Sequence, residues 1–233
     1  MASDWWLSTI FHVSPVLACS WIVWVILSIC LHELGHGWMA IRCGDNTPRA
    51  LGHMTLNPFV HIPWPWAWIM FGLFGFTWGL MPVSPYQFRG RYDDAKVSLA
   101  GPLVNALLAI FCIVLSIAWL ALKTHFAPNV AGNVAVFLWI GVVINLVGVL
   151  FNLIPVPPLD GSSILANFSV RYREFIRSEN GQMASMLGFI LIFTVLGMKI
   201  WNWAFELSDT LLNAAARVTG QEWPGNPLLS ISL

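Results

Sequence analysis

Charged residues are scarce in this sequence. Asp, Glu, Lys and Arg make up 9% of the 233 residues, whereas a soluble globular domain carries about 25%. So little charge cannot cover the surface of a soluble enzyme, and a disordered chain would need more charge and fewer hydrophobic residues. Both classes are therefore excluded. The 11 basic residues are balanced by 11 acidic ones, so there is no basic excess for nucleic acid, and no nucleic-acid partner is expected.

Closely spaced cysteines and a basic N-terminal leader are also missing. The cysteines are Cys19, Cys30, Cys43 and Cys112. None are in CxxC spacing, and we interpret them as small membrane-compatible residues, not as disulfides or thiolate ligands. The first ten residues contain no Lys or Arg, so the basic region of a cleavable signal peptide is absent. We expect the first hydrophobic segment to stay in the mature protein.

Hydrophobic sequence, by contrast, is abundant, at 58% of the chain. A helix that crosses a bilayer needs roughly 20 apolar residues, and several runs reach this length. They cover about residues 15–41, 97–122, 130–153 and 183–205. The first three are predicted to form the core and the last an accessory helix. We predict an all-α polytopic membrane protein with about four transmembrane helices, forming a single membrane-embedded domain over residues 1–233.

A further apolar segment, residues 64–83, has Pro63 and Pro65 at its start and is either short or re-entrant. With the N-terminus outside, a re-entrant segment places most basic residues on the cytoplasmic side, as the positive-inside rule requires. These residues are Arg42, Arg49, Arg89, Arg91, Lys96, Arg171, Arg173 and Arg177. Between the first helix and this segment, residues 50–56 are expected to form a small strand-like loop.

The sequence of the first helix ends in HELGH, residues 32–36. Residues four apart share one face of a helix, so His32 and His36 can bind one metal ion. Glu33 flanks that face and is the candidate general base. It is also the one acidic residue of its apolar run, where a carboxylate is costly and typical of a functional site. The alternative is a hydrated helix end at the membrane interface.

A catalytic zinc site usually has a third protein ligand, and Asp160 is the candidate. It is the only acidic residue of residues 95–173 and follows helix 130–153 after three prolines, which force an irregular path. An Asp before Gly is also common in ordinary turns. For Asp160 to reach HELGH, helices 15–41 and 130–153 must run in the same direction. One crossing between them satisfies this, in agreement with a re-entrant segment.

Small and polar residues share one face of helix 130–153, at i, i+4, i+7 and i+11. They are Gly141, Asn145, Gly148 and Asn152. Such a face is either a helix-packing seam or a functional surface. Asn152 is better placed for chemistry because it lies just before the proline-rich break, whereas Asn145 fits both interpretations.

Together these motifs resemble the site-2 protease family of intramembrane zinc metalloproteases, in its compact bacterial form without PDZ or CBS domains. The resemblance extends from about residue 30 to 165. It rests on HELGH, on AGPLVN at residues 100–105 and on NLIPVPPLDG at residues 152–161, with weaker matches at residues 53–62 and 81–85.

The resemblance implies one zinc ion per chain, bound by His32, His36 and Asp160, with Glu33 as general base. It also implies that Asn152 holds the substrate backbone. We add Asn105 as a candidate substrate contact, although helix packing is the alternative role for this residue. The roles of His53 and His61 in the following loop stay open.

The implied activity is hydrolysis of a peptide bond within or near the transmembrane segment of a membrane-protein substrate, in regulated intramembrane proteolysis. The partners would be that substrate and the lipid bilayer. We expect a bacterial cytoplasmic membrane with the active site toward the cytoplasm. One alternative is a proteolytically inactive zinc-binding or scaffold protein. Another is a membrane protease with a glutamate as third ligand, which is disfavoured because apart from Glu33 no glutamate lies within an apolar helix.

Overall fold

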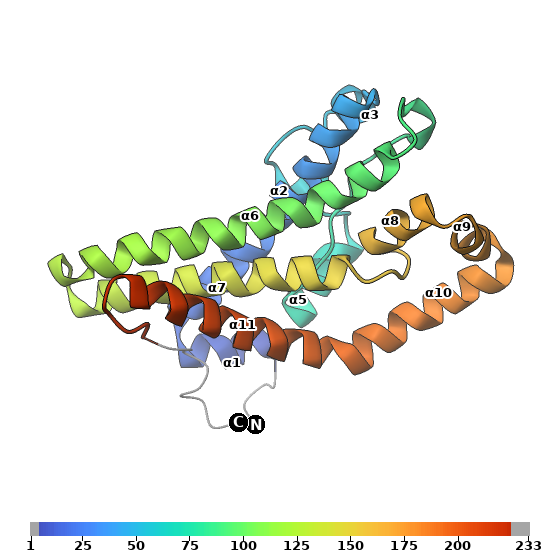
Figure 1. Cartoon of the computed structure of the whole chain (residues 1–233). Coiled ribbons are helices and arrows are strands. Elements are labelled where there is room, and N and C mark those ends of the chain that lie inside the picture. Colours follow the sequence, from blue (N-terminus) through green and yellow to red (C-terminus); the bar gives the residue numbers. More distant parts are fainter. Residues whose placement is uncertain (1–4, 225–233) are drawn as a thin grey trace.

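The computed structural model of the chain describes residues 5–224, which form helices and loops without a strand (Figure 1). Among these residues, four helices are long and apolar enough to cross a membrane: Pro15–Cys43, Asp93–His125, Pro128–Asn152 and Glu179–Val218. The predicted all-α polytopic membrane protein is therefore confirmed. The predicted single domain over residues 1–233 includes residues 1–4 and 225–233, which lie outside the described residues.

The first long helix, α2 (Pro15–Cys43), has clear signals at both ends. The Ser14 side chain accepts a hydrogen bond from the Leu17 backbone N–H at 3.3 Å, and Pro15 occupies the first helical position, where its missing N–H costs nothing. At the other end Gly44 adopts the left-handed conformation, with φ of +108°, which glycine adopts readily. The helix therefore ends just beyond HELGH.

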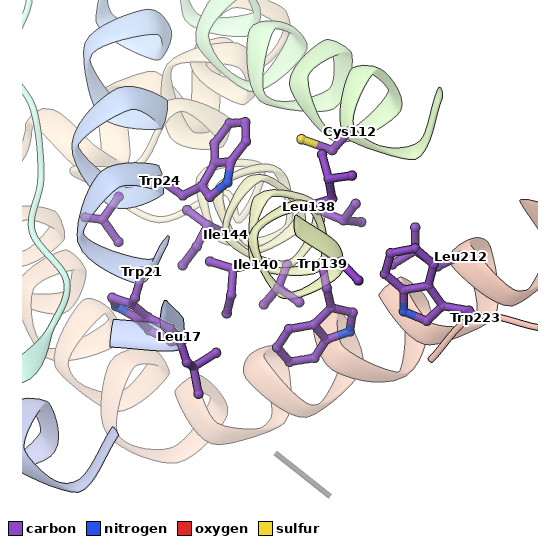
Figure 2. Packing of buried hydrophobic residues seen from close by; sticks show 14 of the residues in the cluster. Leu17, Trp21, Trp24, Cys112, Leu138, Trp139, Ile140, Ile144, Leu212 and Trp223 are labelled. Carbon is purple, nitrogen blue, oxygen red and sulfur yellow. The ribbon is translucent and has the colours of Figure 1, made fainter. Parts of the chain in front are cut away.

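Helix α7 (Pro128–Asn152) lies at the centre of a bundle with α2 and α6 (Asp93–Leu122), and the C-terminal helix α11 (Gly197–Val218) packs against α7 and α6. Figure 2 shows Trp139 and Ile140 of α7 among side chains from the other helices. Trp24 of α2 donates an indole hydrogen bond to the Phe137 carbonyl at 2.9 Å. These contacts fix α7 beside α2, the helix that carries HELGH.

The apolar segment 64–83 contains one short helix, α5 (Trp66–Phe74). Its nine residues span roughly 14 Å at 1.5 Å per residue, far less than the ~30 Å of a bilayer core. The chain then returns, because the Leu80 N–H donates to the His61 carbonyl at 2.8 Å. The segment thus leaves and rejoins the bundle at the same place, as the prediction of a short or re-entrant segment requires.

The expected strand-like loop at residues 50–56 is wrong. Residues 47–50 form a helical turn, α3 (Thr47–Ala50), and residues 51–56 are turns and bends. The cause is local: Asp45 Oδ1 accepts the Thr47 N–H at 2.8 Å, which starts a helical turn. Gly52, with φ of +73°, then reverses the chain before a strand can form.

Several further elements were not predicted as they occur. A short helix, α1 (Trp6–Val13), precedes α2, and α4 (Pro58–His61) and a 3-10 turn at Pro85–Gln87 lie on either side of α5. Residues 162–177 are predicted from the sequence to form one short amphipathic helix, and the structure has two helices there, α8 (Asp160–Phe168) and α9 (Val170–Arg177). The predicted helix 183–205 is the apolar middle of a longer one, formed by α10 (Glu179–Leu191), a π-helical turn (Ile192–Leu196) and α11.

Candidate metal centre

Three potential ligand atoms from α2 and the start of α8 lie close together. The Nε2 atoms of His32 and His36 are 3.0 Å apart. Asp160 Oδ2 lies 3.3 Å from Nε2 of His32 and 3.4 Å from Nε2 of His36. With zinc–nitrogen distances of 2.0–2.1 Å, tetrahedral ligand atoms lie about 3.3 Å apart. The triangle therefore has the size that a tetrahedral zinc ion needs.

The opposite ring nitrogens show which atoms carry protons. His32 Nδ1 lies 2.6 Å from Asn105 Oδ1, and His36 Nδ1 lies 2.7 Å from the Val97 carbonyl oxygen. Both partners are acceptors, so each Nδ1 donates, and a neutral ring then presents a lone pair at Nε2. These lone pairs face each other and a buried Asp160 Oδ2 that has no hydrogen-bond partner. Three electron-rich atoms in this arrangement fit a bound cation.

The approach of α6 to the two histidines depends on a glycine. A Cβ atom on Gly101 would overlap His36 Nε2 and would lie 2.6 Å from His32 Nε2. On α2, Gly35 meets the same segment, since a Cβ there would lie 2.9 Å from the Ala100 carbonyl oxygen. The AGP sequence thus lets the α6 backbone cover the ligand pair directly.

Asp160 is brought to the histidines by the irregular chain that follows α7. Gly161 packs against the end of α7, where a Cβ would overlap the Leu153 carbonyl oxygen. From α9, the Tyr172 hydroxyl donates to the Pro155 carbonyl at 2.8 Å and lies 3.1 Å from Ser162 Oγ. Tyr172 therefore links α9 to the chain on both sides of Asp160. Sequence reasoning missed this residue, because a tyrosine on a surface helix carries no signal of its own.

Glu33 is buried, with 6% of its surface exposed, and lies beside the ligand pair on α2. The returning chain after α5 passes close to it: a Cβ on Gly79 would overlap Glu33 Oε1 and lie 2.5 Å from its Cγ. The carboxyl group is therefore held between α2 and the extended chain at Gly79.

The structure brings one of the two predicted substrate-binding asparagines to the ligands. Asn105 contacts His32, as described above. Asn152 lies at the end of α7, where its side-chain NH2 donates to the Gly148 carbonyl at 3.0 Å. A direct contact of either residue with substrate stays a prediction.

His53 and His61 form a separate pair in the loop between α3 and α5. Their ring centroids are 6.1 Å apart, and His61 is fully buried, with Nε2 donating to the Thr55 carbonyl at 2.6 Å. Burial and the neighbouring His61 hold the pKa of His53 below its ordinary value. The pair lies outside the triangle of His32, His36 and Asp160.

Comparison with known proteins identifies similar sequences. The sequence model of "Peptidase family M50" matches residues 20–195. "Putative zinc metalloprotease YwhC" of Bacillus subtilis is 35% identical over 146 residues, which cover 62% of this chain and 66% of that protein. "Putative zinc metalloprotease Rip2" is 30% identical in Mycolicibacterium smegmatis, over 78% of this chain and 68% of the relative. The Rip2 of Mycobacterium tuberculosis H37Rv is 28% identical, over 91% and 82%. No solved structure matches the chain.

Proposed function

This chain belongs to peptidase family M50, the site-2 protease family of metalloproteases, and on this basis we propose that it is an intramembrane zinc protease. Its reaction would be hydrolysis of a peptide bond within or near the transmembrane segment of a membrane protein. The observation that carries the proposal is the ligand triangle of His32, His36 and Asp160, with Glu33 beside it inside a bundle of membrane-spanning helices.

The ligand triangle would hold one zinc ion per chain. Two neutral imidazoles and one carboxylate are a frequent donor set for catalytic zinc, and they leave a position for water or substrate. When bound, the ion supplies a Lewis acid that polarises the scissile carbonyl and a water molecule. The relatives' printed names, zinc metalloproteases, support the choice of metal.

Glu33 performs the proton transfers in this proposal. Its carboxylate accepts a proton from the attacking water and delivers it to the leaving amine. The enclosure of Glu33 between α2 and Gly79 keeps the carboxyl group in one place, which such transfers require. Asn152, at the end of α7, would hold the unwound substrate backbone by hydrogen bonds.

The same proposal places the site toward the cytoplasm of a bacterial cell. On the side of the site, Arg42 lies in the last turn of α2 and Lys96 in the first turn of α6. Arg89 lies just before α6, and α9 adds three arginines. The opposite ends of the spans have Lys123 and Arg217. Basic residues are enriched on the cytoplasmic side of membrane proteins, so this asymmetry supports the orientation.

A cleavage assay tests the proposed function. The purified protein is reconstituted in vesicles with a panel of single-span membrane proteins, beside the Glu33→Gln variant. We expect the wild type to cut at least one of them within or near its span. The variant should bind zinc equally well and cut none, because the amide cannot accept the proton. A wild type that binds zinc and cleaves no member of the panel, or a Glu33→Gln variant that still cleaves, would contradict the proposal.

A further inference from the structure

Two buried side-chain amides connect His32 to the central helix α7. Asn105 of α6 accepts from His32 Nδ1 through Oδ1 at 2.6 Å and donates through Nδ2 to Asn145 Oδ1 at 2.9 Å. Asn145 in turn donates through Nδ2 to the Gly141 carbonyl at 2.8 Å. Asn105 is 3% exposed and Asn145 is fully buried. Asn145 is therefore connected to the candidate ligand His32 only through Asn105.

The direction of this chain of hydrogen bonds follows from its fixed end. The two ends of an asparagine amide have similar shapes, so partners decide which way each amide points. The Gly141 carbonyl only accepts, so Asn145 must turn its NH2 group toward it. Its oxygen then faces Asn105, whose NH2 donates to that oxygen, and the remaining Asn105 oxygen faces His32.

The last bond in the chain concerns the metal centre directly. An oxygen opposite Nδ1 requires a proton on Nδ1, and a neutral imidazole then has its lone pair on Nε2. We propose that Asn145 is a positioning residue of the metal centre. In this relay, the Gly141 carbonyl fixes the orientation of the Asn145 amide, and Asn145 fixes that of Asn105. The Asn105 oxygen then keeps the proton of His32 on Nδ1, which leaves Nε2 free to bind zinc. This inference rests on the metal site argued above.

The hydrogen-bond partners of Asn105 disfavour the alternative orientation of its amide. A Cβ atom on Gly148 would lie 3.0 Å from both Cγ and Oδ1 of Asn105, so the α7 backbone lies against the amide. If Asn105 turned over, its oxygen would face Asn145 Oδ1 and its NH2 group would face the His32 N–H. His36 needs no such relay, because a backbone carbonyl, that of Val97, already accepts from its Nδ1.

Zinc affinity of the purified, detergent-solubilised protein tests the relay, without any substrate. The dissociation constant is measured by competition with a chelator, and the melting temperature of the zinc-free protein is measured in parallel. We expect Asn145→Leu to raise the zinc Kd about tenfold, in the range seen when outer-shell partners are removed. Ser208→Ala is the matched control: it removes another fully buried side-chain hydrogen bond, to Ala204 on α11, and should leave the Kd unchanged.

A second substitution separates positioning from packing. Asn105→Asp, added to Asn145→Leu, places a carboxylate opposite His32 that accepts in either orientation and needs no partner to direct it. We expect this double variant to regain a near wild-type zinc Kd. An unchanged zinc Kd in Asn145→Leu would overturn the relay. It would also be overturned if the Kd rises, the zinc-free melting temperature falls, and Asn105→Asp does not restore the Kd. A wild type that binds no zinc would instead contradict the metal site itself.

Discussion

His32 and His36 face each other through Nε2 atoms that lie 3.0 Å apart. This is the length of a hydrogen bond, but neither atom carries a proton when both Nδ1 atoms donate elsewhere. Two buried lone pairs that face each other beside the carboxylate of Asp160 are the donor set that a bound cation would stabilise. The geometry of His32, His36 and Asp160 therefore fits that of metal ligands.

Replacing Gly101 by alanine should strongly weaken zinc binding. The added Cβ would overlap His36 Nε2 and displace both ligands, and we expect the zinc affinity to fall about 100-fold, at the upper end of losses from altered metal-site surroundings. Gly132→Ala is the control, since a Cβ at that α7 position meets nothing within 4 Å. Chelator competition measures both variants, and wild-type affinity in Gly101→Ala would show that α6 does not lie where the structure has it.

Replacing Gly79 by alanine should separate metal binding from catalysis. The new methyl group would push the Glu33 carboxyl group aside, since the three atoms nearest to it all belong to Glu33. We expect one zinc ion per chain to be retained and cleavage to fall about 100-fold, the effect of displacing a catalytic group by about 1 Å. Gly72→Ala, where a Cβ has open space, should cleave normally. Equal loss of zinc and cleavage in Gly79→Ala would contradict this placement of Glu33.

The helices and the candidate ligand residues could be predicted from the sequence because their signals are local. Each span is a long apolar run, and HELGH puts two histidines on one helical face whatever surrounds them. The position of Asp160 could be inferred because few acidic residues compete with it. The predicted end of the last helix at residue 205 was wrong, because α11 continues to Val218. This continuation is amphipathic, and its polar residues are not typical of a membrane span.

Relationships between distant segments could not be predicted. Gly79 resembles Gly72 and Gly75 in sequence, and only the return of the chain along α2 shows that Gly79 lies against Glu33. Asn145 fitted both a packing seam and a functional surface, and the hydrogen bond to Asn105 joins residues 40 positions apart. The strand expected at residues 50–56 failed because the Asp45 side chain starts a helical turn.

Asp45 gives the loop after α2 a pH-dependent stability. Burial alone would raise its pKa, but hydrogen bonds from Ser84 and Thr47 outweigh burial and hold the pKa below its ordinary value. The free energy that these bonds contribute is present above the unfolded-state pKa of about 3.9 and is lost as the pH falls through the lower folded-state pKa. The backbone N–H groups of Ser84 and Thr47 lie 2.6 and 2.8 Å from the carboxylate.

Asp45→Asn should therefore destabilise the protein at neutral pH, by about 1–3 kcal/mol, because one buried N–H loses its acceptor. The difference from the wild type should shrink as the pH falls from 5 toward 3. Thermal unfolding in detergent with a chelator present measures this without a contribution from zinc. A constant difference at all pH values would contradict the role given to the ionised Asp45.

The metal centre is tested by the zinc content of the purified protein, measured beside Asp160→Ala. We expect about one zinc ion per wild-type chain and a large loss of zinc in the variant, because a carboxylate at the start of α8 completes a site begun on α2. Full zinc content in Asp160→Ala would remove this residue as a ligand and contradict the joining of the two helices by a metal. No zinc in either protein would contradict the metal centre as a whole.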